Sequence, residues 1–287
     1  NSDGSNYVES FNGSGGLNDL YAGLSIDIWK KRLSVGANVG YLFGNIKHEQ
    51  ANAFVNSSGY NTVRNQNLEV RDIKLDFGIQ YTHPISKREE ITLGLVFSPK
   101  NHLNSTYINT TYNVNSSGSA EVVASDTTKS LAFDIPNSIG FGASYVKKDK
   151  LTLAADVLYE TWDKASYSGS KDSFKDRVRV AAGGEIIPNY QNRNFFSRVR
   201  YRAGAHYSNS YLMINNTEDA AYKGNGYNEY GVSVGFGLPL IDNRSLLNIS
   251  FEYNKIKPGG KNMIDEQYFR FTINYTFNEM WFWKKKI

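Results

Sequence analysis

The chain has 287 residues, a net charge of +4, no cysteine, 20 tyrosines and 16 phenylalanines. A net charge so near zero argues against nucleic acid as the partner. No segment approaches the roughly 18 consecutive apolar residues that a membrane-spanning helix needs, which excludes a helical membrane protein. A membrane β-barrel stays possible, because only alternate positions of its strands are apolar.

Residues 1–6 indicate a solvated loop, and the first strand is predicted at 17–29 after a loop-like lead-in. There Leu20, Leu24 and Ile28 alternate with polar residues, and period two indicates a strand because successive Cβ atoms point to opposite sides. A basic turn at 30–32 leads to a second strand at 33–46. A long polar loop is expected at 48–66.

The rest of the chain continues the same alternation. The connection 103–134 is rich in Asn, Ser and Thr, and we expect it to extend as a hairpin beyond the membrane. Nine further strands bring the expected total to eleven: 67–83, 91–103, one after Pro136, 151–162, 177–187, about 195–211, one around 230–238, 246–254 and 268–277. In the last strand Phe269, Phe271 and Ile273 share one face and Arg270 lies on the other, as expected when one face meets lipid and the other lines a lumen.

The connections between these strands alternate between short and long. Bacterial barrels place short turns in the periplasm and long loops outside the cell, and they have even strand numbers. Eleven strands whose first and last members run the same way cannot close antiparallel, so we expect an odd number of N-terminal strands to be missing from this chain. The alternative is a miscounted strand within 103–134. We therefore assign residues 1–277 to one transmembrane barrel and 278–287 to an aromatic and basic tail on the periplasmic side.

Several motifs occur in a recognisable order. They are Gly15-Gly16-Leu17-Asn18, Ile135-Pro136-Asn137-Ser138 followed by Asp156 and Trp162, Arg200-Tyr201-Arg202-Ala203-Gly204, Gly235-Phe236-Gly237-Leu238-Pro239 and Thr276-Phe277-Asn278-Glu279. Their order and spacing resemble those of the FadL-type outer-membrane transporters of hydrophobic compounds. The resemblance implies an all-β, antiparallel, 14-stranded transmembrane barrel plugged by an N-terminal hatch. This chain would then hold strands four to fourteen, without the first three strands and the hatch.

Charged residues are concentrated on the inward faces of neighbouring predicted strands. The candidate lumenal, ligand-binding set is Asp156, Glu160, Arg177, Arg179, Glu185, Arg198, Arg200 and Arg202. Charges inside a barrel must be paired or hydrated, so one interpretation is an ion-pair network that braces the wall. The other is a site for an amphiphile headgroup, in which arginines bind a carboxylate in bidentate fashion.

Enzymatic and metal chemistry have little support. Of the 4 histidines, only His206 is expected inside, and a lone lumenal histidine is more often a member of a polar network than a catalytic base. Clustered metal ligands are absent from the sequence. We predict no catalytic residues, no metal and no cofactor.

Two functional hypotheses follow for a protein of the Gram-negative outer membrane. The first is a FadL-type channel that takes up hydrophobic or amphiphilic small molecules. The second is a FadL-like barrel that does not transport but serves as a scaffold or subunit of a multiprotein outer-membrane secretion or assembly complex. An adhesin with functional loops is a third possibility. The expected partners are outer-membrane lipid, a hydrophobic or amphiphilic molecule, and other outer-membrane proteins, but not nucleic acid.

Overall fold

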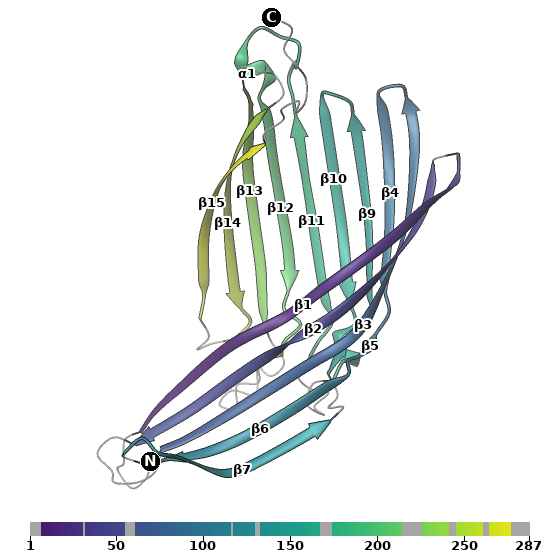
Figure 1. Cartoon of the computed structure of the whole chain (residues 1–287). Coiled ribbons are helices and arrows are strands. Elements are labelled where there is room, and N and C mark those ends of the chain that lie inside the picture. The colour runs from purple at the N-terminus through teal and green to yellow at the C-terminus, as the bar shows by residue number, and fades with distance from the viewer. Residues whose placement is uncertain are drawn as a thin grey trace, which may run out of the picture.

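The computed structural model shows a chain built almost entirely of antiparallel strands (Figure 1). It describes residues 7–30, 32–54, 61–115, 117–129, 133–166, 174–213, 226–240, 245–260 and 264–276. None of the helices in these ranges is long and apolar enough to span a membrane. The predicted tail at 278–287 lies outside the described residues.

Eleven strands form one continuous curved wall, in the order β1-β2-β3-β4-β9-β10-β11-β12-β13-β14-β15, and every pairing along it is antiparallel. Their bounds are β1 Tyr7–Trp29, β2 Leu33–Phe54, β3 Asn61–Ser86, β4 Glu89–Ser98, β9 Ser138–Lys147, β10 Leu151–Glu160, β11 Arg177–Ile186, β12 Arg200–Asn209, β13 Tyr227–Pro239, β14 Leu246–Pro258 and β15 Glu266–Thr276. The predicted fold class and the eleven strands are confirmed. In this order β1 and β15 are the two edges of the described sheet and run in the same direction.

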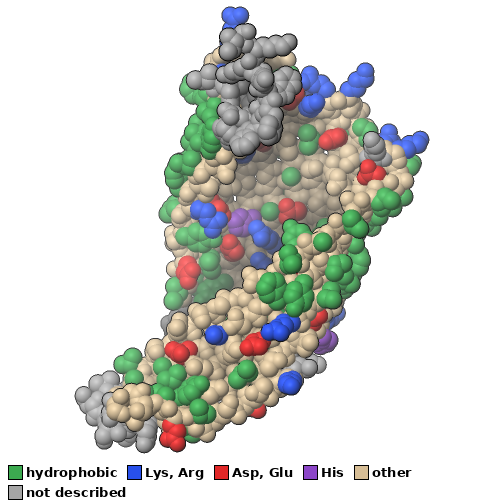
Figure 2. Space-filling view, viewed as in Figure 1, with side chains coloured by type: hydrophobic (Ala, Val, Ile, Leu, Met, Phe, Trp, Pro, Cys, Tyr) green, Lys and Arg blue, Asp and Glu red, His purple; other side chains and the backbone are tan. Residues whose placement is uncertain are grey.

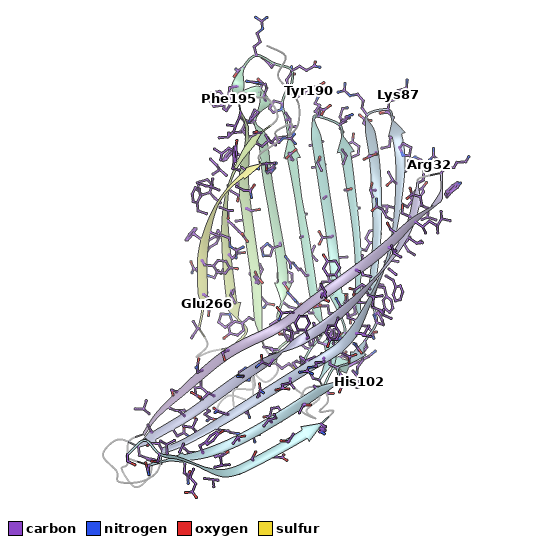
Figure 3. All side chains as sticks on the ribbon, viewed as in Figure 1. Arg32, Lys87, His102, Tyr190, Phe195 and Glu266 are labelled. Carbon is purple, nitrogen blue, oxygen red and sulfur yellow. The ribbon has the colours of Figure 1, made fainter. Side chains whose placement is uncertain are left out.

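The turns divide the wall into two ends. Arg32, Lys87, Tyr190 and Phe195 lie at the end that carries the short turns, whereas His102 and Glu266 lie near the other end (Figure 3). The short-turn end is the periplasmic end of a bacterial barrel, and the opposite end faces the outside of the cell.

The first three strands are much longer than predicted. The supposed lead-in belongs to β1 from Tyr7 onward, and the supposed loop 48–66 supplies the last residues of β2 and the first of β3. Both predictions were wrong for the described part of these segments, and the loop expected at 1–6 lies outside the described residues. Apolar residues such as Val8, Phe11 and Val63 are scattered in the described segments without a regular period, so no pattern marks a strand. The backbone ladder nevertheless runs unbroken from Asn52 paired with Thr62 to Leu33 paired with Tyr81.

A five-stranded extension, which we call the arm, leaves the wall where β3 changes partner. Residues 77–86 of β3 pair with β4, whereas residues 61–70 pair with β6 (Ser105–Val114), which pairs in turn with β7 (Ala120–Lys129). The arm consists of β6, β7 and the halves of β1, β2 and β3 that pair beside them, and it projects away from the wall (Figure 1). The predicted hairpin within 103–134 is thereby confirmed.

A small apolar core lies at the root of the arm. Leu42, Leu68, Val70 and Leu103 are buried there, and the short strands β5 (Asn101–His102) and β8 (Asp134–Ile135) lie beside them. Arg71 N–H donates to Asn104 O at 3.1 Å, which joins the fork in β3 to the segment that leads into β6. The core is therefore placed where the sheet divides.

The two faces of the wall differ in chemistry. On one face cross-strand rows are apolar, for example Val232, Tyr253 and Phe269 in one row of β13, β14 and β15. This face is exposed in the isolated chain, and Phe269 is 82% accessible. The opposite face is the hollow of the wall, where charged side chains gather in Figure 2. Such an arrangement places lipid outside and the ionic groups in the lumen.

Candidate functional site

The lumenal face of β10 to β15 is the candidate site. Strand register decides which side chains reach it, because alternate residues point to the same face and cross-strand partners share it. Glu160 opposite Arg177 and Glu185 opposite Arg202 fall on the inward face. The structure brings five of the eight predicted residues together in two separate clusters, which lie eight residues or about 27 Å apart along β11.

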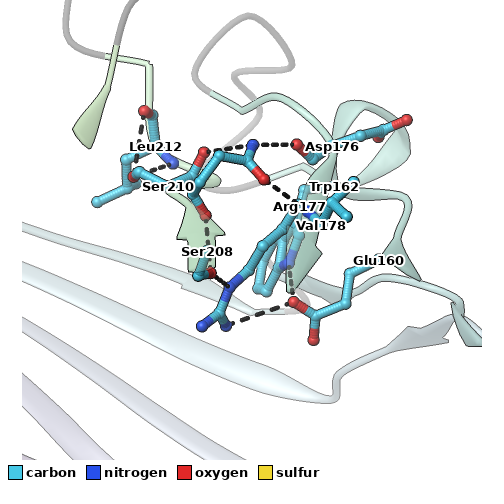
Figure 4. A network of polar contacts seen from close by, with 9 residues as sticks. Glu160, Trp162, Asp176, Arg177, Val178, Ser208, Ser210 and Leu212 are labelled. Carbon is cyan, nitrogen blue, oxygen red and sulfur yellow. Dashed lines mark hydrogen bonds and ion pairs between the residues drawn. The ribbon is translucent and has the colours of Figure 1, made fainter. Parts of the chain in front are cut away.

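The first cluster, which Figure 4 shows, lies where β10 ends and β11 begins, away from the short turn that joins β9 to β10. The guanidinium of Arg177 lies 3.4 Å from the Glu160 carboxylate, and its Nε donates to Ser208 Oγ at 3.1 Å. Glu160 also accepts a hydrogen bond from Trp162 Nε1 at 3.2 Å. Beside them is a cavity of about 380 Å³ whose lining includes Tyr211. Arg177 is thus already neutralised and oriented by the wall itself.

Aromatic and acidic side chains form the rim above this cluster. The rings of Trp162 and Tyr211 stack with centroids 4.3 Å apart. Nearby, a hydrogen bond to Asp176, burial and the Asp176 charge raise the pKa of Asp163. Burial alone would raise the pKa of Asp176, but its hydrogen bonds from Tyr159 and the Asp163 backbone lower it below its ordinary value. As the pH falls, Asp163 therefore takes up a proton before Asp176 does.

The second cluster lies toward the periplasmic end. Glu185 accepts from Arg200 Nη1 at 2.9 Å and from Arg202 Nε at 2.7 Å, and Arg202 Nη1 donates to Asn248 at 2.8 Å. Gly237 makes room for this packing, since a Cβ there would lie 3.1 Å from Arg200 Cβ. Two guanidinium groups share one carboxylate, so this cluster carries an excess positive charge.

His206 lies between the two clusters. Its Nε2 is 3.4 Å from Glu229 Oε1, and Gly231 faces the ring so closely that a Cβ there would lie 2.0 Å from His206 Cε1. The fully buried Asn254 is also near Gly231 and donates to Glu252 at 2.8 Å. These contacts make His206 part of a polar network.

Asp156 and Arg179 are not joined to either cluster by a contact with a described residue, and Arg198 lies outside the strands. Asp156 and Arg179 are exposed on the lumenal face, and neither makes an ion pair or hydrogen bond with another described residue. Arg198 does not lie on a strand as predicted. It is the last residue of the one-turn helix α1 (Phe195–Arg198). The helix begins after Asn194, because Asn194 Oδ1 accepts the Phe196 N–H at 3.0 Å. Among the described residues, no group of three or more His, Cys, Asp and Glu side chains is arranged to hold a metal.

Sequence reasoning missed the neutral partners of the arginines, Ser208 and Asn248. Their inward position follows from strand alternation, but pairing them with Arg177 and Arg202 requires the register between strands. That register depends on turn geometry and on the matched apolar rows, and it could not be assigned from residue types alone.

An antiparallel wall with an apolar outer face and an ionic lumen defines the class of the protein as an outer-membrane β-barrel. The chain is similar in fold to a Pseudomonas aeruginosa FadL homologue, with 16% identity and a TM-score of 0.54 over 86% of this chain and 60% of that one. It is similar also to a chain of the RagAB peptide importer, with 13% identity and a TM-score of 0.50 over 86% of this chain and 30% of that one. The chain thus spans less than two thirds of the length of either structure.

The protein belongs to the BamG family, whose model matches residues 1–287. No curated protein matches the chain. The resemblance to FadL is therefore a likeness of fold, whereas the family of the chain is BamG.

Proposed function

We propose that the protein is a barrel subunit of a multiprotein outer-membrane assembly, with a BAM-associated role that matches its family name. The barrel anchors the protein in the membrane and the arm contacts the partner. The observation that carries this proposal is the arm itself. β1, β2 and β3 contain 23, 22 and 26 residues, whereas a strand needs only about 9–11 to cross the membrane.

The outer edge of the arm is suited to pairing with another chain. Within the described residues β7 pairs only with β6, and its ten residues are almost all exposed. Val122 and Val123 are 55% and 57% accessible on this edge. An open strand edge presents unpaired N–H and C=O groups, to which an extended segment of a partner adds as a further strand.

The lumen supports the same proposal. Glu160 is matched to Arg177 and Glu185 to Arg200 and Arg202, so these groups stabilise the wall rather than line an apolar passage. Such pairing is expected of a barrel that serves as a membrane anchor rather than as a channel.

The experiment is affinity purification of the full-length, tagged protein from its own outer membranes. We expect stable co-purification with other envelope proteins, and loss of that partner when Val122 and Val123 are both replaced by lysine, which adds charge to the edge. Thr111→Val, on the neighbouring strand β6, is the matched control and should retain the partner. A wild-type protein that purifies alone, or an edge variant that retains every partner, would overturn the proposal.

A second candidate, uptake of amphiphilic molecules, is favoured by the excess positive charge at Arg200 and Arg202. A free carboxylate could share these guanidinium groups with Glu185, since arginine binds carboxylates in bidentate geometry. The test is uptake of a fluorescent fatty acid by cells that carry wild-type protein or Arg200→Ala/Arg202→Ala. Channel function predicts uptake that falls at least several-fold in the variant. Equal uptake by both strains and by a deletion strain argues against it.

A further inference from the structure

The outward face of the arm contains a polar groove that the functional proposals above do not use. Strand register builds it from two adjacent cross-strand rows. One row is Ser14, Lys47, Asn67 and Ile108, and the next is Asn12, Glu49, Asn65 and Thr110. Together with Tyr112 these residues line a concavity of about 400 Å³ that crosses β1, β2, β3 and β6.

Several polar groups in this groove have no partner in the protein. Asn65 Oδ1 is buried and accepts no hydrogen bond. The side chains of Asn12, Lys47 and Glu49 likewise make no hydrogen bond or ion pair with other described residues, although Lys47 and Glu49 are two residues apart on one face of β2. A buried acceptor without a partner costs free energy. This cost indicates that a ligand or ordered water completes the groove.

The donor and acceptor set matches a saccharide. Amide side chains both donate and accept, lysine donates and glutamate accepts, and sugar hydroxyl groups require both. Tyr112 and Ile108 supply apolar surface at one side, against which the C–H face of a sugar ring can pack. One lysine and one glutamate leave the groove without net charge, which favours hydroxyl groups over a phosphate or carboxylate.

The height of the groove above the membrane identifies the source of the sugar. On β2 the outward residues Val39, Tyr41 and Phe43 are apolar, and the next three outward residues, Asn45, Lys47 and Glu49, are polar. Lys47 and Glu49 follow Phe43 by four and six residues, or about 14 and 20 Å along the strand. Because β2 runs obliquely to the strands of the wall (Figure 1), the groove lies less far above the apolar band than these distances along the strand.

We propose that this groove binds sugar residues of the lipopolysaccharide that surrounds the barrel in the outer leaflet. The contact fixes the arm against the membrane surface. Asn65 and Thr110 on β3 and β6 hydrogen-bond the sugar hydroxyl groups, with Lys47 and Glu49 completing the other side.

The test uses the full-length protein in phospholipid nanodiscs, titrated with lipid-free core oligosaccharide released from the lipopolysaccharide of the source bacterium. We expect binding by calorimetry, weakened about tenfold in Asn65→Leu, as expected for the loss of one or two hydrogen bonds. Thr110→Val should weaken binding less. The matched control is Thr111→Val, the next residue of β6 but on the opposite face, and it should bind as the wild type does.

A dextran fragment of similar length distinguishes the lipid-borne sugar from free extracellular glycans. Weaker binding of dextran supports the proposal, and equal binding overturns the assignment to lipopolysaccharide. Absence of core oligosaccharide binding at millimolar concentration, or unchanged binding in Asn65→Leu with an unaltered circular dichroism spectrum, overturns the site itself.

Discussion

The wall and the arm belong to one sheet, but the wall lies in the membrane and the arm lies outside it. In the wall, β9 to β12 contain ten residues each, present Phe, Tyr, Val and Ile outward, and carry paired charges inward. In the arm neither face carries a continuous apolar row, although Val8, Phe11, Val122 and Val123 are exposed, and the buried apolar residues at its root form one small cluster. The comparison teaches that strand pairing alone extends a sheet beyond the membrane, whereas side chains decide which solvent each part occupies.

The change from the membrane-spanning wall to the arm occurs within the single strand β2. From Leu33 to Phe43 its outward residues are apolar over about 34 Å of strand. At a tilt of about 45° this corresponds to about 24 Å of membrane, close to the apolar band of known barrels. The pairing with β1 and β3 continues past Phe43 without interruption.

The largest effect is expected at the arm root. Leu68→Ala should cost about 4 kcal/mol, because Leu68 is 2% exposed and truncation of a buried leucine leaves a cavity. The cost should be local, so that amide hydrogen exchange accelerates in β6 and β7 and stays unchanged in β10 to β12. Val123→Ala on the exposed edge is the control and should alter neither region. Uniform acceleration throughout the barrel would show that wall and arm unfold as one unit.

A second substitution pair separates the two solvents on one face of β2. Val39→Arg lies near the middle of the apolar band and should destabilise the barrel by about 3 kcal/mol in lipid. Ala53→Arg, which shares that face in the arm, should change stability by about 0.5 kcal/mol or less. Urea unfolding in lipid vesicles measures both. Similar costs at the two positions would place the arm in the membrane and contradict the comparison.

The same division explains how far the sequence could be interpreted. The wall was predictable because lipid on one side and a polar lumen on the other impose period-two alternation, as in Phe269 to Tyr275. The arm halves of β1, β2 and β3 were not predictable, because neither of their faces meets the apolar interior of the membrane. No regular alternation then marks the strands, and only backbone pairing remains. The inward direction of Arg200 and Arg202 was predictable from the alternation of side chains along a strand. Their convergence on Glu185 required the pairing register between β11 and β12. Whether this set binds a ligand stays a prediction.

The third prediction concerns the charged contact at the arm root. Asp134 is 2% exposed and accepts from Lys100 Nζ at 2.9 Å and from Ser166 N–H at 3.1 Å, with His102 beside it. Burial raises its pKa, but the Lys100 and Ser166 hydrogen bonds and the positive charges of Lys100 and His102 outweigh that effect, so the pKa of Asp134 lies below its ordinary value.

A lowered pKa in the folded state means that the stabilisation is complete above the unfolded pKa, about 3.9 for aspartate, and is lost as the pH falls through the folded value. Asp134→Asn should therefore cost about 2 kcal/mol at pH 7. Protease resistance of the arm should fall below about pH 4 in the wild type, whereas the variant should show no such dependence. An arm equally resistant at pH 3 and pH 7 would exclude this role for Asp134.

The smallest effect is expected in the lumen, where two arginines of β11 provide a matched pair. Arg177→Lys retains the charge near Glu160 but loses the Nε–H that donates to Ser208 Oγ at 3.1 Å, since the lysine ammonium cannot reproduce the guanidinium fork. We expect a loss of about 1 kcal/mol in unfolding free energy. Arg179→Lys should have no measurable effect, because Arg179 is exposed and makes no hydrogen bond or ion pair with another described residue. If both substitutions cost the same, lumenal arginines would act through net charge alone, and the paired network would not be what stabilises the wall.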